Sequence, residues 1–181
     1  MIITIILNYC YRIYNKIADI IRNKSIKCRI TPDSIPPHVL GKIYIQVNKL
    51  KTGKNVTFYP GVYLWGNDIE IGDNVEIGIG TIIYAKKKVK IGSNSSIAGQ
   101  CYIIDTNHGT KAGTLFRTQP DETASNGIII GEDVWIGAQC SILKGSKIND
   151  GVIIGAQSLV NSEIPNNAII VGCPAKVIKY R

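Results

Sequence analysis

The feature that most constrains this chain is an aliphatic residue that returns at every sixth position over much of its length. A period of six matches neither the 3.6-residue helix nor the alternation of an ordinary strand. It matches a short strand followed by a tight corner, so that three units close one triangular coil and the aliphatic side chains stack inside it. Twelve positions share this pattern: Ile71, Ile77, Ile83, Ile91, Ile97, Ile103, Ile130, Ile136, Ile142, Ile148, Ile154 and Val160.

Two further regularities accompany this ladder. Gly or Ala often follows the aliphatic residue, and we expect it beside the corners, where the chain turns and a Cβ would clash. Isoleucine dominates while the chain has only 2 Phe, 1 Met and 2 Trp, which is typical of one packing site repeated many times. We therefore predict an all-β solenoid, a parallel β-helix of hexapeptide repeats. Small or β-branched residues stand four positions after the aliphatic ones: Val75, Thr81, Ser95, Cys101, Val134, Cys140, Ser146, Val152 and Ser158.

The period breaks at two places. The first break includes Lys86, Lys87 and Lys88, which are expected to form an exposed corner. The second is a step of 27 residues after Ile103, filled mostly by a polar segment without isoleucine at residues 109–127. A long loop in a regular solenoid is usually functional or disordered. This one begins directly after His108.

Outside the repeats, residues 2–23 carry apolar side chains at spacings of three and four, which predicts a helix. Residues 31–37, TPDSIPP, hold three prolines and are expected to be a linker. The chain therefore divides into four predicted segments: a helical segment at 1–30, a linker and lead-in strand at 31–55, the β-helix at 56–165 with its loop at 109–127, and a C-terminal tail at 166–181.

The charge is unevenly distributed. The net charge is +8, and residues 1–30 supply +5 of it, because they hold six basic residues against one acid. Such a balance favours anionic partners. The predicted helix is expected to pack on the domain or on a neighbouring subunit. The alternative is a peripheral membrane contact, with Arg12, Lys16 and Arg22 facing acidic headgroups.

Several classes of protein do not fit. No helix-turn-helix or zinc-finger spacing and no aromatic-rich basic stripe is present, so we expect no nucleic acid partner. No apolar run reaches the roughly 18 residues of a membrane span. Five cysteines without short regular spacing indicate a reducing compartment, and Cys101 and Cys140 are predicted to be unreactive packing residues. A cytoplasmic protein is expected, with association to the inner face of the membrane as an alternative.

In its motifs the chain resembles the hexapeptide-repeat acyltransferases, particularly the branch of sugar and polysaccharide O-acetyltransferases. The resemblance implies left-handed coils and a homotrimer with active sites between neighbouring subunits. It also implies transfer of an acetyl group from acetyl-CoA to a hydroxyl, without a metal. The motifs are IGDNVEIG at 71–78, DTNHG at 105–109, IIIGEDVWIGAQCSILKG at 128–145, VIIGAQSLV at 152–160 and IPNNAIIVGCPAKVIK at 164–179.

His108 is the candidate general base. The chain has two histidines, and His38 lies outside the repeats, where a structural or exposed role is expected. His108 precedes the loop and matches the family's catalytic histidine, and an imidazole can accept and return a proton near neutral pH. The resemblance implies direct transfer, with no covalent acyl-enzyme. Asp105 and Asn107 are candidates for orienting the imidazole or contacting the acceptor, and are alternatively corner residues.

The resemblance also implies a donor site. Small residues there would let the pantetheine arm approach the backbone, and basic residues near the C-terminus would meet the coenzyme A phosphates. The tryptophan in this set is alternatively a trimer-packing residue, and the lysines are alternatively solvated terminal charges. The residues concerned are Trp135, Gly137, Ala138, Ala156, Lys176 and Lys179.

Three other functions compete with this one. A zinc hydratase of the γ-carbonic anhydrase type requires three histidine ligands, and the chain has two histidines. A non-catalytic solenoid scaffold is compatible with the repeats, because fold does not fix function, but it needs no histidine at a loop. Serine O-acetyltransferases carry a long helical domain ahead of the repeats, whereas 55 residues precede them here. A sugar hydroxyl is therefore the preferred acceptor, with an amino-sugar nitrogen or an antibiotic hydroxyl as alternatives.

Overall fold

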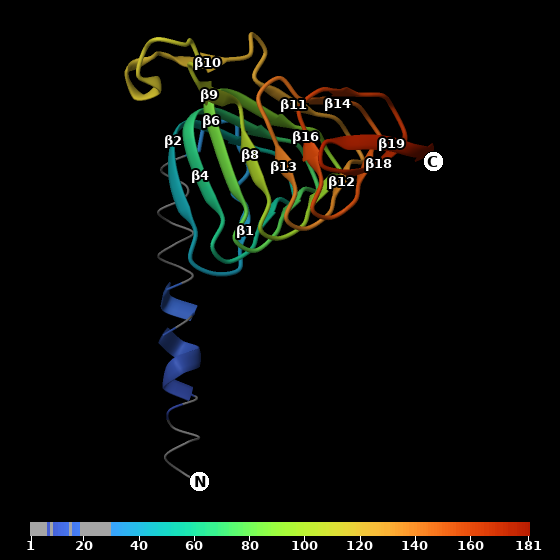
Figure 1. The fold of residues 1–181 in the computed structure, drawn as a ribbon. Helices are drawn as coiled ribbons and strands as arrows, with labels where there is room; N and C mark the ends of the chain where they lie inside the picture. Colours follow the sequence, from blue (N-terminus) through green and yellow to red (C-terminus); the bar gives the residue numbers. More distant parts are fainter. Residues whose placement is uncertain (1–6, 8, 15, 19–29) are drawn as a thin grey trace.

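The computed structural model describes residues 7, 9–14, 16–18 and 30–181. It contains a three-sided solenoid of short parallel strands, from which a helix projects at one end and a loop at one corner (Figure 1). Helical backbone is described at residues 7, 9–14 and 16–18. The predicted all-β solenoid of hexapeptide repeats with an N-terminal helix is confirmed.

The first face of the solenoid is a sheet in the order β1-β3-β5-β7-β12-β15-β18, in which every neighbouring pair is parallel. A last strand, β19, closes the edge in antiparallel sense. The strands are β1 (His38–Val39), β3 (Thr57–Phe58), β5 (Glu76–Ile77), β7 (Ser96–Ile97), β12 (Trp135–Ile136), β15 (Ile153–Ile154), β18 (Ala168–Gly172) and β19 (Ala175–Tyr180).

The second and third faces share three long strands, β2 (Tyr44–Thr52), β4 (Tyr63–Ile71) and β6 (Ile82–Ile91). Their first halves continue on the second face as β8 (Tyr102–Ile104), β13 (Ser141–Ile142) and β16 (Leu159–Val160). Their second halves continue on the third face as β11 (Ile128–Ile130), β14 (Lys147–Ile148) and β17 (Glu163–Ile164). Each long strand therefore crosses the corner between these two faces.

The core is the predicted aliphatic ladder. On the first face Ile77, Ile97, Ile136 and Ile154 are paired in register from coil to coil. All twelve positions of the ladder are buried, and so are all nine of the small positions. Cys101 belongs to this second set, and its thiol donates to the Gly137 carbonyl at 3.2 Å. The stacking of identical side chains explains why one residue type dominates the composition.

At two of the three corners, residues other than glycine adopt the left-handed region. The corner between the third and first faces, here the Asn corner, has Asn55, Asn74 and Asn94 at φ 54°, 56° and 60°. The corner between the first and second faces, here the Gln corner, has Gln100, Gln139 and Gln157, each at φ 60°. The amide side chains form ladders along both corners: Asn55 to Asn74 at 3.0 Å, Asn74 to Asn94 at 2.9 Å, Gln139 to Gln100 at 3.0 Å and Gln157 to Gln139 at 3.1 Å.

The glycines that follow the aliphatic residues serve a different purpose from these corner residues. A Cβ on Gly78 would lie 2.5 Å from the carbonyl carbon of Ala98, and a Cβ on Gly137 would lie 2.6 Å from the amide nitrogen of Ala156. Real Cβ atoms essentially never come so close to backbone atoms. The expected Cβ clash is therefore present, and it is with the backbone of the next coil.

The solenoid extends beyond the boundaries predicted at residues 56 and 165. Strand β2 pairs with β4 in parallel from Tyr44 to Thr52, so the segment at 31–55 contains the first coil as well as a lead-in. At the other end, β18 pairs in parallel with β15. These outer coils lack the repeated Ile-Gly pair, since Val39, Ile45 and Thr52 occupy the ladder positions of the first one, and this is why the period did not reveal them.

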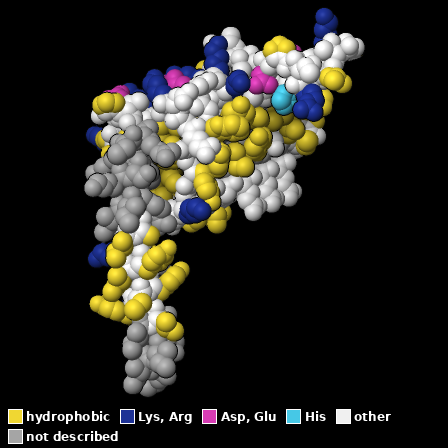
Figure 2. All heavy atoms as spheres, turned by 90° about the vertical axis from the view of Figure 1, so that its left-hand side faces the viewer, with side chains coloured by type: hydrophobic (Ala, Val, Ile, Leu, Met, Phe, Trp, Pro, Cys, Tyr) yellow, Lys and Arg dark blue, Asp and Glu magenta, His cyan; other side chains and the backbone are white. Residues whose placement is uncertain are grey.

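The N-terminal helix projects away from the solenoid, and its apolar side chains are exposed (Figures 1 and 2). Packing on its own domain is therefore wrong for the described part, whereas packing on a neighbouring subunit stays a prediction. Ile6, Ile20 and Arg22 lie outside the described residues. In the part of the chain that the structure describes, no helix is long and apolar enough to cross a bilayer. The exposed helix residues are Leu7, Tyr9, Tyr11, Ile13, Tyr14 and Ile17.

Candidate functional site

The loop expected at 109–127 leaves the corner between the second and third faces. The chain departs from the solenoid after Ile104 and returns at Ile128, and we call residues 105–127 the excursion and their corner the excursion corner. The excursion begins and ends as an antiparallel ribbon of β9 (Thr106–His108) and β10 (Asp121–Thr123), in which His108 lies opposite Asp121. A single turn of 3-10 helix, η1 (Phe116–Thr118), lies between the two strands.

Asp105 fixes the base of the excursion. Its side chain is fully buried, and its two carboxylate oxygens accept hydrogen bonds from the backbone amides of Lys86, Lys87 and Lys88, at 2.7, 2.9 and 2.7 Å. A buried carboxylate is stabilised when several N–H groups donate to it. Of the two alternatives for Asp105, these contacts favour the corner residue. Any effect on the imidazole would be indirect.

His108 faces a carboxylate that the sequence did not reveal. Its Nδ1 lies 3.1 Å from Oδ1 of Asp121, and the other carboxylate oxygen of Asp121 lies 2.9 Å from Nζ of Lys86. The hydrogen bond from Lys86 is the main cause that lowers the pKa of Asp121 below its ordinary value, and His108 adds to it. The same bond raises the pKa of Lys86. Asp121 therefore stays ionised at neutral pH and can orient the imidazole.

This arrangement determines which nitrogen of His108 is available. A proton on Nδ1 points at the Asp121 carboxylate, so Nε2 of the neutral ring keeps its lone pair. The His108 side chain is 67% exposed, whereas that of Asp121 is 27% exposed. The ring of Phe116 meets the imidazole edge-on at 5.8 Å between centroids. The site thus presents an oriented and accessible imidazole.

Other contacts hold the excursion in place. Gln119 accepts from the Lys111 amide at 2.8 Å and donates to the carbonyls of Lys111 and Thr114 at 3.0 Å. Lys144, on the next coil, pairs with Glu122 at 2.8 Å. Asn107 is exposed on β9, and among the described residues its side chain makes no hydrogen bond to His108.

No pattern in the sequence pointed to Asp121. The residue lies in the aperiodic segment, and only the β9–β10 ribbon brings it opposite His108. Lys86 was predicted as an exposed corner residue, which is correct, but its contact with Asp121 was not expected. An expectation that the two ends of the loop pair as an antiparallel ribbon would have placed a residue near Asp121 opposite His108.

The candidate donor residues lie on the first face and at the Gln corner. Trp135 points outward from β12 and is 55% exposed. Gly137 is buried behind it, and Ala138 and Ala156 are exposed in successive coils, where their small side chains leave the backbone open. Four of the predicted donor residues are therefore grouped on adjacent coils.

Lys176 and Lys179 lie on β19, at the C-terminal edge of the same face. The pairing runs in register from Trp135 to Ile153, then to Ile169 and to Lys179. Three strand spacings separate Trp135 from Lys179, which is about 14 Å. Both lysines are exposed and make no ion pair with the described residues. The two lysines therefore lie on the same face as the other candidates, one strand beyond β18.

The structure does not bring His108 and the donor candidates together within one chain. His108 lies at the excursion corner, and Ala138 lies at the Gln corner. These corners are the two opposite edges of the second face, roughly 15 Å apart at about 3.3 Å per residue of strand. A thioester bound at the Gln corner is therefore out of reach of the histidine of the same chain.

The structure offers little for a metal ion. No group of three or more His, Cys, Asp or Glu side chains that could hold one occurs among the described residues. His38 is exposed on β1, at the first face.

A family model described as "Bacterial transferase hexapeptide (six repeats)" matches residues 127–162. Escherichia coli WbbJ, a putative lipopolysaccharide biosynthesis O-acetyl transferase, is 33% identical over 67% of this chain and 62% of its own length. E. coli WcaF, a putative colanic acid biosynthesis acetyltransferase, is 31% identical over 72% of this chain and 69% of its own length. The chain thus spans less than two thirds of WbbJ and slightly more than two thirds of WcaF.

A similar solved structure is AntD, an N-acyltransferase from Bacillus cereus in complex with dTDP and 3-hydroxybutyryl-CoA. Its TM-score is 0.70 at 21% identity, and the match covers 88% of each chain. At this identity the likeness shows the fold.

Proposed function

Because the chain belongs to the hexapeptide-repeat acyltransferase family, we propose that it transfers an acetyl group from acetyl-CoA to a hydroxyl of a sugar or polysaccharide precursor, with His108 as general base. The observation that carries the proposal is the geometry at the excursion corner. Asp121 lies 3.1 Å from Nδ1 of His108 and leaves the other ring nitrogen exposed. WbbJ and WcaF, whose names place them in lipopolysaccharide and colanic acid biosynthesis, support the class of acceptor.

The proposed reaction is a direct transfer. Nε2 of His108 takes the proton of the acceptor hydroxyl, whose oxygen attacks the thioester carbonyl carbon. The carbon–sulfur bond of the tetrahedral intermediate then breaks, and the imidazolium returns its proton to the coenzyme A thiolate. Asp121 stabilises the imidazolium while it exists. General acid–base catalysis of this kind contributes about 10²–10⁴-fold in rate.

The Gln corner is the proposed donor site. The exposed Ala138 and Ala156 let the amide-rich pantetheine arm lie against the backbone of successive coils. Trp135 flanks this corner on the first face. Lys176 and Lys179 are positioned to pair with the phosphates of coenzyme A, because ammonium groups bind phosphates as point charges. Asn107, next to the base and exposed, is proposed to contact the acceptor.

A homotrimer is part of the proposal, because a single chain separates the base from the donor corner. The second face between them carries exposed aromatic and aliphatic side chains, and exposed apolar patches mark interaction surfaces. If three copies turn this face toward a common axis, the excursion corner of each copy meets the Gln corner of its neighbour. The patch consists of Tyr44, Trp65, Ile82 and Tyr102, with Tyr84 stacked on Trp65 at 4.4 Å.

The N-terminal helix and the location of the protein follow the same reasoning. A trimer would bring three helices with exposed apolar side chains to one end of the assembly, where they can pack on each other. Arg12 and Lys16 are exposed beside these side chains, so peripheral contact with an acidic bilayer is the alternative use of the helix. We propose a cytoplasmic enzyme, with association to the inner face of the membrane as the alternative.

The direct test is release of coenzyme A from acetyl-CoA, with the mass of the product identified, against a panel of neutral sugars, nucleotide sugars, amino sugars, serine and chloramphenicol. The proposal expects turnover with a sugar and a product that carries one acetyl group on oxygen. If only serine or only chloramphenicol is acetylated, the proposed class of acceptor is wrong. No release of coenzyme A and no binding of coenzyme A would favour a scaffold.

Shared active sites can be tested separately. His108→Ala removes the base, and Ala138→Trp blocks the proposed donor corner, so each variant alone should be inactive. Co-expression of the two should restore part of the activity, because some sites in mixed trimers combine an intact base with an intact neighbouring corner. A monomer by light scattering, or mixed assemblies without activity, would contradict the trimer.

A further inference from the structure

We propose that a lysine-lined pocket on the third face, beside the excursion, binds a phosphate group of the acceptor. The acceptor would then be a sugar that carries a phosphate or diphosphate, either as a soluble nucleotide sugar or as a lipid-linked sugar diphosphate. This inference rests on the proposed function, which it narrows to one class of acceptor.

The pocket has a volume of about 350 Å³ and lies where the excursion returns to the solenoid. Three lysines come from the corner and the third-face half of β6, two polar residues come from the end of the excursion, and one isoleucine comes from β11. No carboxylate lines it. The lining residues are Lys87, Lys88, Lys90, Ser125, Asn126 and Ile129.

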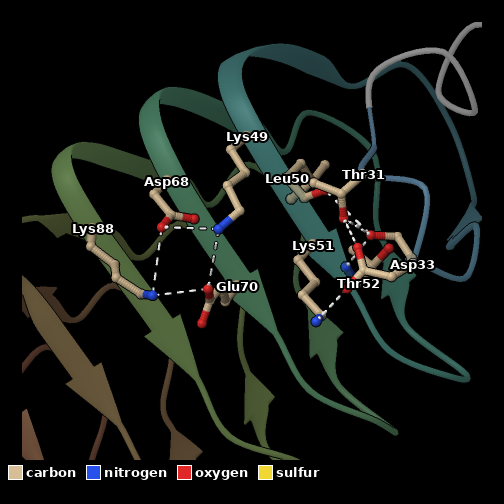
Figure 3. A network of polar contacts seen from close by, with 10 residues as sticks. Thr31, Asp33, Lys49, Leu50, Lys51, Thr52, Asp68, Glu70 and Lys88 are labelled. Carbon is tan, nitrogen blue, oxygen red and sulfur yellow. Dashed lines mark hydrogen bonds and ion pairs between the residues drawn. The ribbon is translucent and has the colours of Figure 1, made fainter.

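The three lysines differ in how their charge is used. Lys88 is neutralised locally, because its ammonium lies 2.8 Å from Glu70 and 3.5 Å from Asp68 (Figure 3). Lys87 and Lys90 make no ion pair within 4.0 Å among the described residues, although Lys90 contributes at longer range to lowering the pKa of Glu70. Two of the three charges are thus left for a ligand.

The walls of the pocket are fixed by the backbone. The amides of Lys87 and Lys88 are bound to the buried carboxylate of Asp105. The opposite wall is a turn closed by the hydrogen bond from the Gly127 amide to the Ala124 carbonyl, at 3.1 Å. Gly127 has φ +67° and lies so close to the Lys88 carbonyl that a Cβ there would clash. The turn that carries Ser125 and Asn126 is therefore seated directly on the lysine corner.

The donor set suits a phosphate. Two ammonium groups, a hydroxyl and a side-chain amide surround the space, and a phosphate group offers several acceptor oxygens and up to two negative charges. A neutral sugar would not need two cations without carboxylate partners. The proposed site for the coenzyme A phosphates, Lys176 and Lys179, lies on the first face, so the pocket on the third face is left for the other substrate.

The pocket is close enough to the base to belong to the same reaction. Ser125 follows Asp121, the partner of His108, by four residues, so their Cα atoms are at most about 14 Å apart. Lys87 follows Lys86, which pairs with Asp121 at 2.9 Å. An acceptor longer than one sugar ring can therefore place a hydroxyl at His108 and a phosphate in the pocket.

The test compares acceptors and variants in the full-length protein. For the wild type, a nucleotide sugar or a lipid-linked sugar diphosphate in micelles should have a lower KM than the matching free sugar, and the one of the two that is turned over identifies the source. The variant Lys87→Ala/Lys90→Ala should raise that KM about tenfold or more, which corresponds to about 1.4 kcal/mol. Its kcat, and its KM for the free sugar, should stay unchanged.

Two control variants change lysines in ways that should leave the phosphate site intact. Lys147→Ala removes a lysine from β14 on the same face, where it pairs with Glu163 at 2.7 Å, and it should leave the KM unchanged. The conservative variant Lys87→Arg/Lys90→Arg should keep a KM close to that of the wild type, because arginine retains both positive charges. Equal KM values for phosphorylated and free sugars in the wild type, or an unchanged KM in the double alanine variant, would overturn the proposal.

A binding measurement separates this proposal from the proposed function. Pyrophosphate titrated in a calorimeter into Lys176→Ala/Lys179→Ala, which lacks the proposed donor-site lysines, should bind, and this binding should be lost when Lys87→Ala/Lys90→Ala is combined with that variant. If no acceptor is acetylated but pyrophosphate binding follows this pattern, the transferase assignment fails and the phosphate pocket stands. If acetylation is found in the wild type and pyrophosphate binds the combined variant as well as it binds Lys176→Ala/Lys179→Ala, the pocket fails alone.

Discussion

The solenoid and the excursion are built on opposite principles. In the solenoid every coil repeats the contacts of the last, with isoleucines buried in register and backbone hydrogen bonds running from coil to coil. In the excursion most side chains are exposed, and its position depends on a few polar contacts, those of Asp105, Gln119, Asp121 and Glu122. Stability is therefore spread over many equivalent sites, whereas the proposed general base lies on one loop.

This separation teaches how such a fold accommodates a site. A corner of a solenoid can lose its regular turn and carry an insertion, because the strands on either side stay paired with the coils above and below them. Strand β8 pairs with β6 and β13, and β11 pairs with β6 and β14. Changes in the excursion should then affect activity alone, and changes in the ladder should affect stability first.

Excision of the excursion tests this separation most severely. Deletion of residues 106–126, which joins Asp105 to Gly127 in a turn like the one at Lys144 and Gly145, should reduce acetyl transfer to background, because the proposed base and its partner are both lost. The midpoint of thermal unfolding should change by only a few degrees. A variant that fails to fold would contradict the claim that the solenoid is stable without the excursion.

Truncation of a ladder residue should have the largest effect on stability. Ile136→Ala removes a fully buried side chain from between Ile97 and Ile154, and such a cavity costs about 2–5 kcal/mol. The matched control is Ile79→Ala, which truncates an isoleucine that is exposed at the Gln corner and should change the free energy of unfolding by less than about 0.5 kcal/mol. Denaturant titration measures both, and equal effects would contradict a core confined to the ladder.

Asp105 lies at the boundary of the solenoid and the excursion, so its replacement should affect both stability and activity. Asp105→Ala leaves three amides of the lysine corner without their acceptor, and a buried group without a partner costs about 1–3 kcal/mol. We expect faster amide hydrogen exchange at residues 86–88 and lower activity. Asp150→Ala, which removes an exposed carboxylate bonded to one amide at the Asn corner, should cost less. If Asp105→Ala changes neither the amide exchange nor the activity, Asp105 does not position the excursion.

The smallest expected effect is a pH dependence of the resistance of the excursion to proteolysis. The folded-state pKa of Asp121 is lowered, first by Lys86, so its ion pair is present above the ordinary pKa of about 3.9 and is lost as the pH falls through the lowered value. Lys86→Met removes that cause, so acid should loosen the excursion at a higher pH than in the wild type. Proteolysis of residues 109–127 across the acid range measures this, and identical profiles would contradict the ion pair.

Much of the fold and part of the site followed from the sequence. The ladder from Ile71 to Val160 predicted the core, because a period of six has one structural solution. The first coil was missed because Val39, Ile45 and Thr52 stand at its ladder positions in place of the repeated pair of isoleucine and glycine. His108 was found from its motif. Asp121 was not, because its position depends on pairing between the two ends of an aperiodic loop, and no local pattern encodes that pairing.

The most direct test of the account is a side-by-side measurement of turnover and unfolding in His108→Ala. If the excursion holds the base and the solenoid holds the fold, coenzyme A release should fall by about 10²–10⁴-fold, while the unfolding midpoint stays at the wild-type value. Wild-type turnover without the imidazole would contradict the account, and so would a loss of activity that is explained by a loss of folding.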